Sequence, residues 1–111
     1  VMVTPVHLHI GQEAVPAGVC AHLKAQDIIF FSHRTHGPAL AKGLEMKQLM
    51  AELYGRITGC SRGYGGSMHL VDPPHGILGS SSIVGGGIAL GVGSALAAKI
   101  KNEDRIAVSY F

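Results

Sequence analysis

A histidine and an arginine follow directly on a short apolar run in the first third of the chain. The sequence reads DIIFFSHRTHG over residues 27–37, which places His33 and Arg34 just past the end of an expected buried strand. The planar guanidinium group of arginine presents a fork of donors that suits phosphate oxygens. The same side chain could form a surface ion pair with a carboxylate, and position alone leaves both interpretations open.

A glycine-rich segment offers a second feature suited to anions. In CSRGYGGSMH, residues 60–69, the backbone N–H groups can approach an anion closely because glycine has no Cβ. The segment matches neither the P-loop, which ends in Gly-Lys-Ser/Thr, nor the Gly-x-Gly-x-x-Gly pattern that opens a helix after a strand. By itself it is weak support for a phosphate site.

The chain is rich in histidine, with seven histidines against three tyrosines and no tryptophan. This balance favours a site that handles protons, phosphates or metal. His7 and His9 have strand spacing, and His33 and His36 could complete a zinc-like cluster with them. No acidic or cysteine ligand lies nearby at a recognised spacing, which favours histidines that bond to backbone or line a polar cavity.

The elements that must position these residues alternate between helix and strand. Apolar residues recur at helical spacing in several segments, and two short runs rich in β-formers are typical of buried parallel strands. Such alternation predicts an α/β fold. The expected elements are a helix over 11–24, a strand over 27–32, a helical turn closed by Gly43, a helix over 46–57, a long loop over 58–76, a ligand loop over 79–85, a helix over 85–99 and a strand over 104–111.

Two of these helices carry specific expectations. Pro16 must lie in or just after the first turn of its helix, where a missing N–H is least harmful. In the helix over 46–57, Met46 and Met50 follow the apolar period and are expected in the core.

Composition limits the possible classes of protein. The chain has 111 residues, 47% of them hydrophobic and 14% charged, which predicts one ordered domain. Basic residues are scattered and the net charge is +2, so a nucleic-acid interface is not indicated. The uncharged run over 76–98 is too loop-like and too rich in glycine and alanine for a membrane span.

Location is indicated by the cysteines and by the first residues. Cys20 and Cys60 are too few for a disulfide scaffold and are expected to be reduced, small core residues of a cytosolic protein. Residues 1–10 lack the basic and apolar regions of a signal peptide. We therefore expect a cytoplasmic protein.

Five segments together resemble one family. HLHIGQEAVPAGVCAHL, HRTHGPALAKG, LMAELYGRITGCSRGYGGSMHL, GSSSIVGGGIALGVGSALAAK and DRIAVSYF follow the order and spacing of the α subunit of thiamine-diphosphate-dependent 2-oxo acid dehydrogenases. These oxidoreductases include the pyruvate, acetoin and branched-chain enzymes. The resemblance covers nearly the whole chain. It implies that residues 1–111 are part of a single thiamine-diphosphate-binding domain, with a parallel sheet and helices on both faces, incomplete in this chain.

The resemblance assigns roles to five residues of this sequence. His33 and Arg34 match the pair that contacts the cofactor diphosphate, although the family often has tyrosine where His33 stands. Ser82 and Val84 match the loop whose backbone groups hydrogen-bond the aminopyrimidine ring. His7 matches a histidine that faces the bound 2-oxo acid.

Other positions receive weaker assignments. His9 departs from the common family residues and is assigned no role. Asp72 aligns only loosely with a position on the substrate side. The glutamate that activates the cofactor in this family belongs to the β subunit, so Glu13 is not its counterpart. Its place at a helix start suits a structural capping role.

The resemblance also implies a cofactor, partners and a reaction. Thiamine diphosphate is expected with Mg²⁺, whose ligands in the family follow a Gly-Asp-Gly motif that would come directly after Phe111. The chain is thus expected to be an amino-terminal piece, inactive alone. In an α2β2 heterotetramer it would work with a β subunit, with the small residues over 85–99 packing closely against helices of a partner. The reaction implied is oxidative decarboxylation of a 2-oxo acid, with the acyl group passing to a lipoyl-bearing acyltransferase.

Several alternatives stay open. Pyruvate is the first choice of substrate, with acetoin and branched-chain 2-oxo acids behind it. A transketolase-like thiamine enzyme is disfavoured by the combination of His-Arg-x-His-Gly with Gly-Gly-Ser-Met-His. A non-catalytic assembly fragment is the remaining class.

Overall fold

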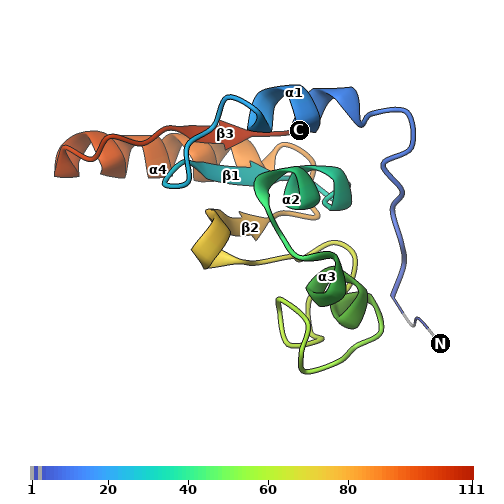
Figure 1. Cartoon of the computed structure of the whole chain (residues 1–111). Coiled ribbons are helices and arrows are strands. Elements are labelled where there is room, and N and C mark those ends of the chain that lie inside the picture. Colours follow the sequence, from blue (N-terminus) through green and yellow to red (C-terminus); the bar gives the residue numbers. More distant parts are fainter. Residues whose placement is uncertain (1, 3) are drawn as a thin grey trace.

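The computed structural model describes residue 2 and residues 4–111 of the chain (Figure 1). Helices and short strands alternate, as the sequence predicts. In chain order the elements are α1 (Ala14–Cys20), β1 (Ile28–Phe31), α2 (His36–Lys42), α3 (Met46–Leu53), the 3-10 helix η1 (Pro73–His75), β2 (Ile77–Ser80), α4 (Gly86–Lys101) and β3 (Ala107–Ser109).

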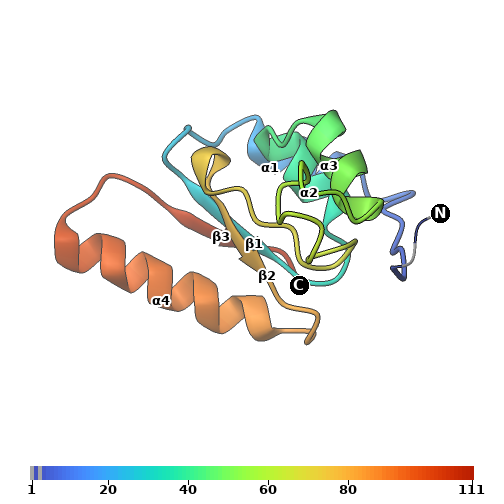
Figure 2. The ribbon, with the colours of Figure 1, turned by 90° about the horizontal axis from the view of Figure 1, so that it is seen from below.

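The described strands form one parallel sheet in the order β2-β1-β3. Helix α4 lies against β1 and β3 on one face, whereas α1, α2 and α3 lie on the other (Figures 1 and 2). The predicted α/β class, with a parallel sheet and helices on both faces, is therefore confirmed. Because all three strands run the same way, their carboxyl ends lie at one edge of the sheet, where ligand sites of such folds occur.

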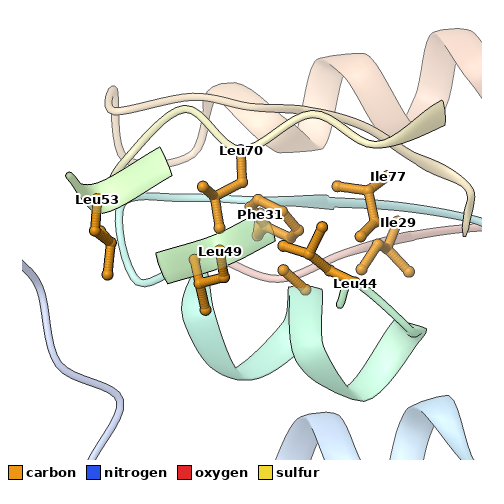
Figure 3. Packing of buried hydrophobic residues seen from close by; sticks show 8 residues of the cluster. Ile29, Phe31, Leu44, Leu49, Leu53, Leu70 and Ile77 are labelled. Carbon is orange, nitrogen blue, oxygen red and sulfur yellow. The ribbon is translucent and has the colours of Figure 1, made fainter. Parts of the chain in front are cut away.

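Strand β1 is central and buried on both faces. Ile29 and Phe31 belong to the main apolar cluster, which they form with leucines of α3 and the loops and with Ile77 of β2 (Figure 3). Phe30 points to the opposite face, where it lies under Gly87 of α4. Burial on both sides explains why this strand is a continuous apolar run rather than an alternating one.

Helix α4 packs closely through its small residues, but against the chain's own sheet. Gly87, Gly91 and Ala98 are its buried residues, and a Cβ on Gly91 would collide with the hydroxyl of Ser109 in β3. The expectation that the small residues serve contact with other helices is wrong for these positions. Large apolar residues of α4 are exposed instead: Ile88, Leu90, Val92, Leu96 and Ile100. Within the described part of the chain, α4 included, no helix has the length and apolar content to cross a membrane.

Helix α3 ends earlier than the apolar period suggests. Gly55 has a φ of +63°, and the N–H groups of Gly55 and Arg56 donate to the carbonyls of Glu52 and Ala51, which is a Schellman motif. Met46 and Met50 are exposed, so the prediction that they belong to the core is wrong. Leu49, Leu53 and a charged residue, Glu52, are buried instead.

The other differences concern short elements. Helix α1 ends at Cys20, because beyond Ala21 the N–H groups of His22 and Leu23 bond carbonyls only three residues back. Pro16 does lie in its first turn. The helical turn before Gly43 is a full helix, and Gly43 closes it with a φ of +118°. Strand β2, with the sequence ILGS, was not expected at all. Its glycine and serine suggest a loop, and pairing with β1 makes it a strand.

Candidate functional site

A pocket of about 540 Å³ opens beyond the carboxyl ends of β1 and β3. Three of the five predicted site residues line it: His33 and Arg34, which follow β1, and Val84, which precedes α4. Residues of α1, of the segment before it and of the last positions of the sequence, including Tyr110, also contribute to the lining. Residues about fifty positions apart thus meet where a parallel sheet places its strand ends.

Arg34 is exposed in the pocket wall. Its Nη1 donates a hydrogen bond of 2.5 Å to the carbonyl oxygen of Leu8. Among residues 2 and 4–111, no carboxylate lies within 4.0 Å of the guanidinium group. The structure therefore does not show the surface ion pair that the sequence left open, and most of the donor fork remains available to a ligand.

His7 lies at the margin of the pocket. It is not among the lining residues, but its ring meets that of His33 edge-on, with centroids 5.0 Å apart. Its backbone N–H donates to the hydroxyl of Ser67 at 3.2 Å. The structure thus brings His7 and His33 together, although they come from different parts of the chain.

His9 lines the pocket, although it was assigned no role. Its ring packs directly on Gly37, where any Cβ would collide with it, and both ring nitrogens are buried without a described hydrogen-bond partner. The spacing of His7 and His9, two positions apart as on one face of a strand, is the sequence feature that could have indicated the position of His9 near the site. In the described residues, no group of three or more potential ligands could hold a metal ion, so the zinc-like cluster gains no support.

The loop before α4 presents free backbone groups. Val84 is 70% exposed and borders the pocket, whereas Ser82 is exposed but does not line it. Within the part of the chain that the structure describes, no acceptor bonds the N–H groups of Ser82, Val84 or Gly85. This loop can offer main-chain donors to a ligand.

The glycine loop over 60–69 behaves differently. Its N–H groups do surround an anion, but the anion is the carboxylate of Glu52, which is fully buried. Oε2 accepts from the N–H groups of Ser61 and Gly63 at 2.8 and 2.9 Å, and Oε1 accepts from those of Gly65 and Gly66 at 2.7 and 3.1 Å. These donors are thus not available to a phosphate. An acidic residue on the apolar side of α3 was the signal that sequence reasoning missed.

Two titrating side chains are held in their neutral forms. Burial lowers the pKa of His36, and the neighbouring His9 and His7 lower it further. Burial also raises the pKa of Tyr110 well above its ordinary value, and contact with the thiol of Cys20, 3.6 Å away, adds to this. The hydroxyl of Tyr110 is therefore neutral where it contacts the thiol of Cys20.

The remaining candidates lie outside the pocket. Asp72 accepts a bond from His75 Nδ1 at 2.6 Å beside the start of β2, at the opposite end of the sheet. Glu13 precedes α1 but accepts the N–H of Gly11 rather than a helical one, and hydrogen bonds to backbone N–H groups lower its pKa. Glu13 thus occupies the expected N-cap position of α1, but its side chain makes no capping hydrogen bond with the described residues. Cys20 and Cys60 are free, as expected, and both are partly buried; Cys60 packs against the main apolar cluster.

Comparison with known proteins finds one family and several relatives. The family model described as "Dehydrogenase E1 component" matches residues 3–111. The α subunit of acetoin:2,6-dichlorophenolindophenol oxidoreductase from Bacillus subtilis is 50% identical over 96% of this chain and 32% of its own length. Pyruvate dehydrogenase E1 α subunits from rice chloroplast (α-3) and Zymomonas mobilis are 46% and 44% identical, over 88% and 95% of this chain. The chain spans about a third or less of the length of these curated relatives, with 23% of the rice subunit and 30% of the Zymomonas subunit covered.

Proposed function

Since this chain belongs to the dehydrogenase E1 component family, we propose that it forms the amino-terminal part of the thiamine-diphosphate-binding domain of an E1 α subunit. The observation that carries the proposal is the position of Arg34 at the carboxyl end of β1, in a pocket shared with Val84. Its guanidinium group has no carboxylate partner among residues 2 and 4–111. An anionic cofactor fits such a site, because both a cation and free main-chain donors face it.

The roles of individual residues follow from this arrangement. Arg34 and His33 would hold the diphosphate, and the main-chain groups of Ser82 and Val84 would hold the aminopyrimidine ring. His7, beside His33, would face the substrate. Thiamine diphosphate, when bound, supplies the electron sink that decarboxylation of a 2-oxo acid requires. The Mg²⁺ ion stays a prediction that rests on the family.

For the substrate we propose pyruvate, with acetoin as a second candidate. The pyruvate dehydrogenase α subunits among the relatives support the first. The 50% identity to an α subunit named for acetoin supports the second. Parallel assays of the assembled enzyme with both compounds, under identical cofactor conditions, decide between them.

For partners we propose a β subunit, in an α2β2 heterotetramer, and a lipoyl-bearing acyltransferase. The exposed apolar residues of α4 support the first of these. Val92 and Ile100 are 65% and 76% exposed, and such residues gather on partner-facing surfaces. Contact with a β subunit would cover them.

Substitution of Arg34 tests the cofactor site. In the α subunit assembled with its β partner, Arg34→Ala should weaken thiamine diphosphate binding by roughly ten- to a hundred-fold, because a charge-assisted bond to phosphate contributes about 1.5–3 kcal/mol. Arg34→Lys should recover only part of this, since a point charge lacks the fork. The rate at saturating cofactor should fall much less. The measurement is the half-saturation concentration for thiamine diphosphate.

A second arginine provides the control. Arg56 is exposed beyond the end of α3 and lines no part of the pocket, so Arg56→Ala removes an equal charge elsewhere. Its half-saturation should match that of the unsubstituted enzyme. Because Arg34→Ala also removes the bond to Leu8, thermal midpoints of all variants should be compared. An unchanged half-saturation in Arg34→Ala would remove Arg34 from the site.

A further inference from the structure

Ser67, in the glycine loop, connects three separate segments. It is fully buried, and each of its polar groups has a partner. Its N–H donates to Thr4 Oγ1 at 3.4 Å, and its carbonyl oxygen accepts from Thr35 Oγ1 at 2.5 Å. Its hydroxyl lies 2.9 Å from His36 Nε2 and accepts the backbone N–H of His7. One side chain thus joins the amino-terminal segment, the start of α2 and the glycine loop.

The backbone of Ser67 is held firmly from both sides. The preceding residues, Gly65 and Gly66, donate their N–H groups to the buried carboxylate of Glu52. On the other side, Thr35 is itself fully buried and anchors the Ser67 carbonyl. The hydroxyl of Ser67 is therefore held in one place, so it can in turn hold another residue in position.

Hydrogen-bond accounting gives the direction of the hydroxyl. The Ser67 oxygen accepts from His7, and its own proton needs an acceptor because the group is buried. His36 Nε2 is the acceptor within reach, so Ser67 donates to it and His36 carries its proton on Nδ1. The lowered pKa of His36 agrees with a neutral ring that accepts at Nε2.

The bond to His7 has a consequence at the pocket margin. His7 lies in a segment without regular secondary structure, so its own backbone does not fix its position. The backbone N–H of His7 donates to the hydroxyl oxygen of Ser67, and the ring of His7 contacts the ring of His33 edge-on. We propose that Ser67 is a positioning residue, whose hydroxyl, oriented by His36, holds His7 at the margin of the pocket where it faces the substrate. The substrate-facing part of this statement rests on the proposed function.

A simpler alternative is that Ser67 only satisfies buried polar groups. Ser61 provides the comparison, because it lies in the same loop and its hydroxyl bonds two backbone groups. It donates to the carbonyl of His69 and accepts from the N–H of Val71, so both partners belong to the same connection between α3 and η1. Loss of either hydroxyl should cost stability, but only that of Ser67 should release His7.

The first measurement is amide hydrogen exchange over residues 4–10 of the α subunit assembled with its β partner. Ser67→Ala should accelerate exchange at His7 several-fold or more, because its N–H loses a buried acceptor. Ser67→Cys keeps the volume but accepts hydrogen bonds weakly, and should give a smaller acceleration. Ser61→Ala should leave this segment unchanged. Unchanged exchange in both Ser67 variants would overturn the proposal, whatever the enzyme's activity.

The second measurement is kinetic, with pyruvate and acetoin tested separately. Loss of one hydrogen bond corresponds to about a five- to tenfold effect, so Ser67→Ala should lower kcat/KM for the substrate by about that factor. The half-saturation for thiamine diphosphate should change less than that. A normal kcat/KM in Ser67→Ala with accelerated exchange would overturn the substrate-positioning role. If the unsubstituted assembly processes neither compound, the proposed function is wrong for these substrates and the positioning role falls with it, while exchange still shows whether Ser67 holds His7.

Discussion

Two glycine-rich segments of similar composition serve opposite purposes. Residues 59–66 wrap their N–H groups around the carboxylate of Glu52, and the segment is closed to any other anion. Residues 79–85 form the end of strand β2 and the loop that leads from it to α4 beside the pocket, and the N–H groups of Ser82, Val84 and Gly85 have no partner among the described residues. The first is a structural element that contains its own anion. The second is open to a ligand.

The difference lies in a residue outside both segments. Glycine and serine make a backbone able to bind an anion in either case. A buried acid on the preceding helix supplies the anion in the first case, and within residues 2 and 4–111 no basic side chain lies within 4.0 Å of it. Backbone donors thus replace the countercharge that a buried carboxylate needs. To predict whether a glycine loop can bind a ligand anion, one must therefore also check whether the neighbouring helix carries an acidic residue at a core-facing position.

The largest effect is expected at Glu52. Glu52→Ala leaves four half-buried N–H groups without their acceptor. Each such group costs up to about 1–3 kcal/mol, partly relieved where water enters. We expect a loss of at least about 3 kcal/mol in the free energy of unfolding, measured by urea denaturation of the assembled subunit. Glu52→Gln should recover part of this, because one carbonyl oxygen can still accept from two donors.

The control for this substitution lies on the same helix. Glu45 precedes α3, is exposed and makes no capping hydrogen bond with its side chain. Glu45→Ala should therefore change stability by less than about 1 kcal/mol. Equal losses for the two alanine variants would contradict the closed-loop interpretation.

Much of the fold could be predicted from the sequence because local signals specify it. The apolar run of β1 and the glycine that closes α2 are such signals, and the structure confirms both. The end of α3, strand β2 and the Glu52 contacts depend on partners distant in the chain. The apolar period predicts Met50 in the core, but Met50 is exposed and Glu52 is buried. An apolar pattern does not indicate which polar side chain will find hydrogen-bond donors in the core.

The candidate site divides in the same way. His33 and Arg34 could be expected at the ligand edge of the sheet because they follow a predicted strand. Val84 was linked to them only by the family resemblance, because the strand before its loop, β2, was not predicted. The proximity of His7 to His33 and the position of His9 could not be expected, because both histidines belong to an irregular segment held by distant residues. The roles proposed for Ser82 and Val84 belong to their backbone groups. Because many side chains are compatible with such roles, the residue types at these positions give little information about them.

The second prediction compares one glycine from each region. A Cβ on Gly65 would collide with the backbone carbonyl of His69, whereas a Cβ on Gly79 would meet nothing within 4 Å. Neither has a positive φ, so the comparison isolates space from backbone strain. Gly65→Ala should cost about 1–3 kcal/mol, and Gly79→Ala should change stability by less than about 1 kcal/mol. Urea midpoints measure both, and a larger loss at Gly79 would reverse the assignment of closed and open segments.

A smaller carboxylate site at the other end of the sheet gives the third prediction. Asp27 is buried and accepts two backbone N–H groups, from Ile106 at 2.9 Å and from Lys24 at 2.7 Å. Burial raises the pKa of this carboxyl, but the two N–H bonds and nearby lysines outweigh burial, so its pKa lies below the ordinary 3.8. A lowered folded-state pKa gives stability that is present above the unfolded pKa and is lost as pH falls through the folded one.

The corresponding experiment is a pH series with Asp27→Asn. With two donors instead of four, the cost near pH 6 should be about 1–2 kcal/mol, less than at Glu52. As pH falls below about 3.8, the unsubstituted protein should lose this advantage and the two urea midpoints should converge. Midpoints that stay equally far apart at every pH would show that ionisation of Asp27 is not the source of the difference.

The smallest effect is expected at Ser82, in the open segment. Its side chain is exposed and makes no hydrogen bond in the described residues, so Ser82→Ala should change stability by less than about 0.5 kcal/mol. The proposed contact of Ser82 with the aminopyrimidine ring uses main-chain groups, which alanine retains at this position. The half-saturation for thiamine diphosphate should therefore stay within about twofold of the unsubstituted enzyme, in contrast to the large change expected for Arg34→Ala. A tenfold rise would show that the hydroxyl itself binds the cofactor. In that case the open segment would act through a side chain, whereas residues 59–66 act through backbone N–H groups, and the two segments would differ in the groups they use as well as in whether an anion already occupies them.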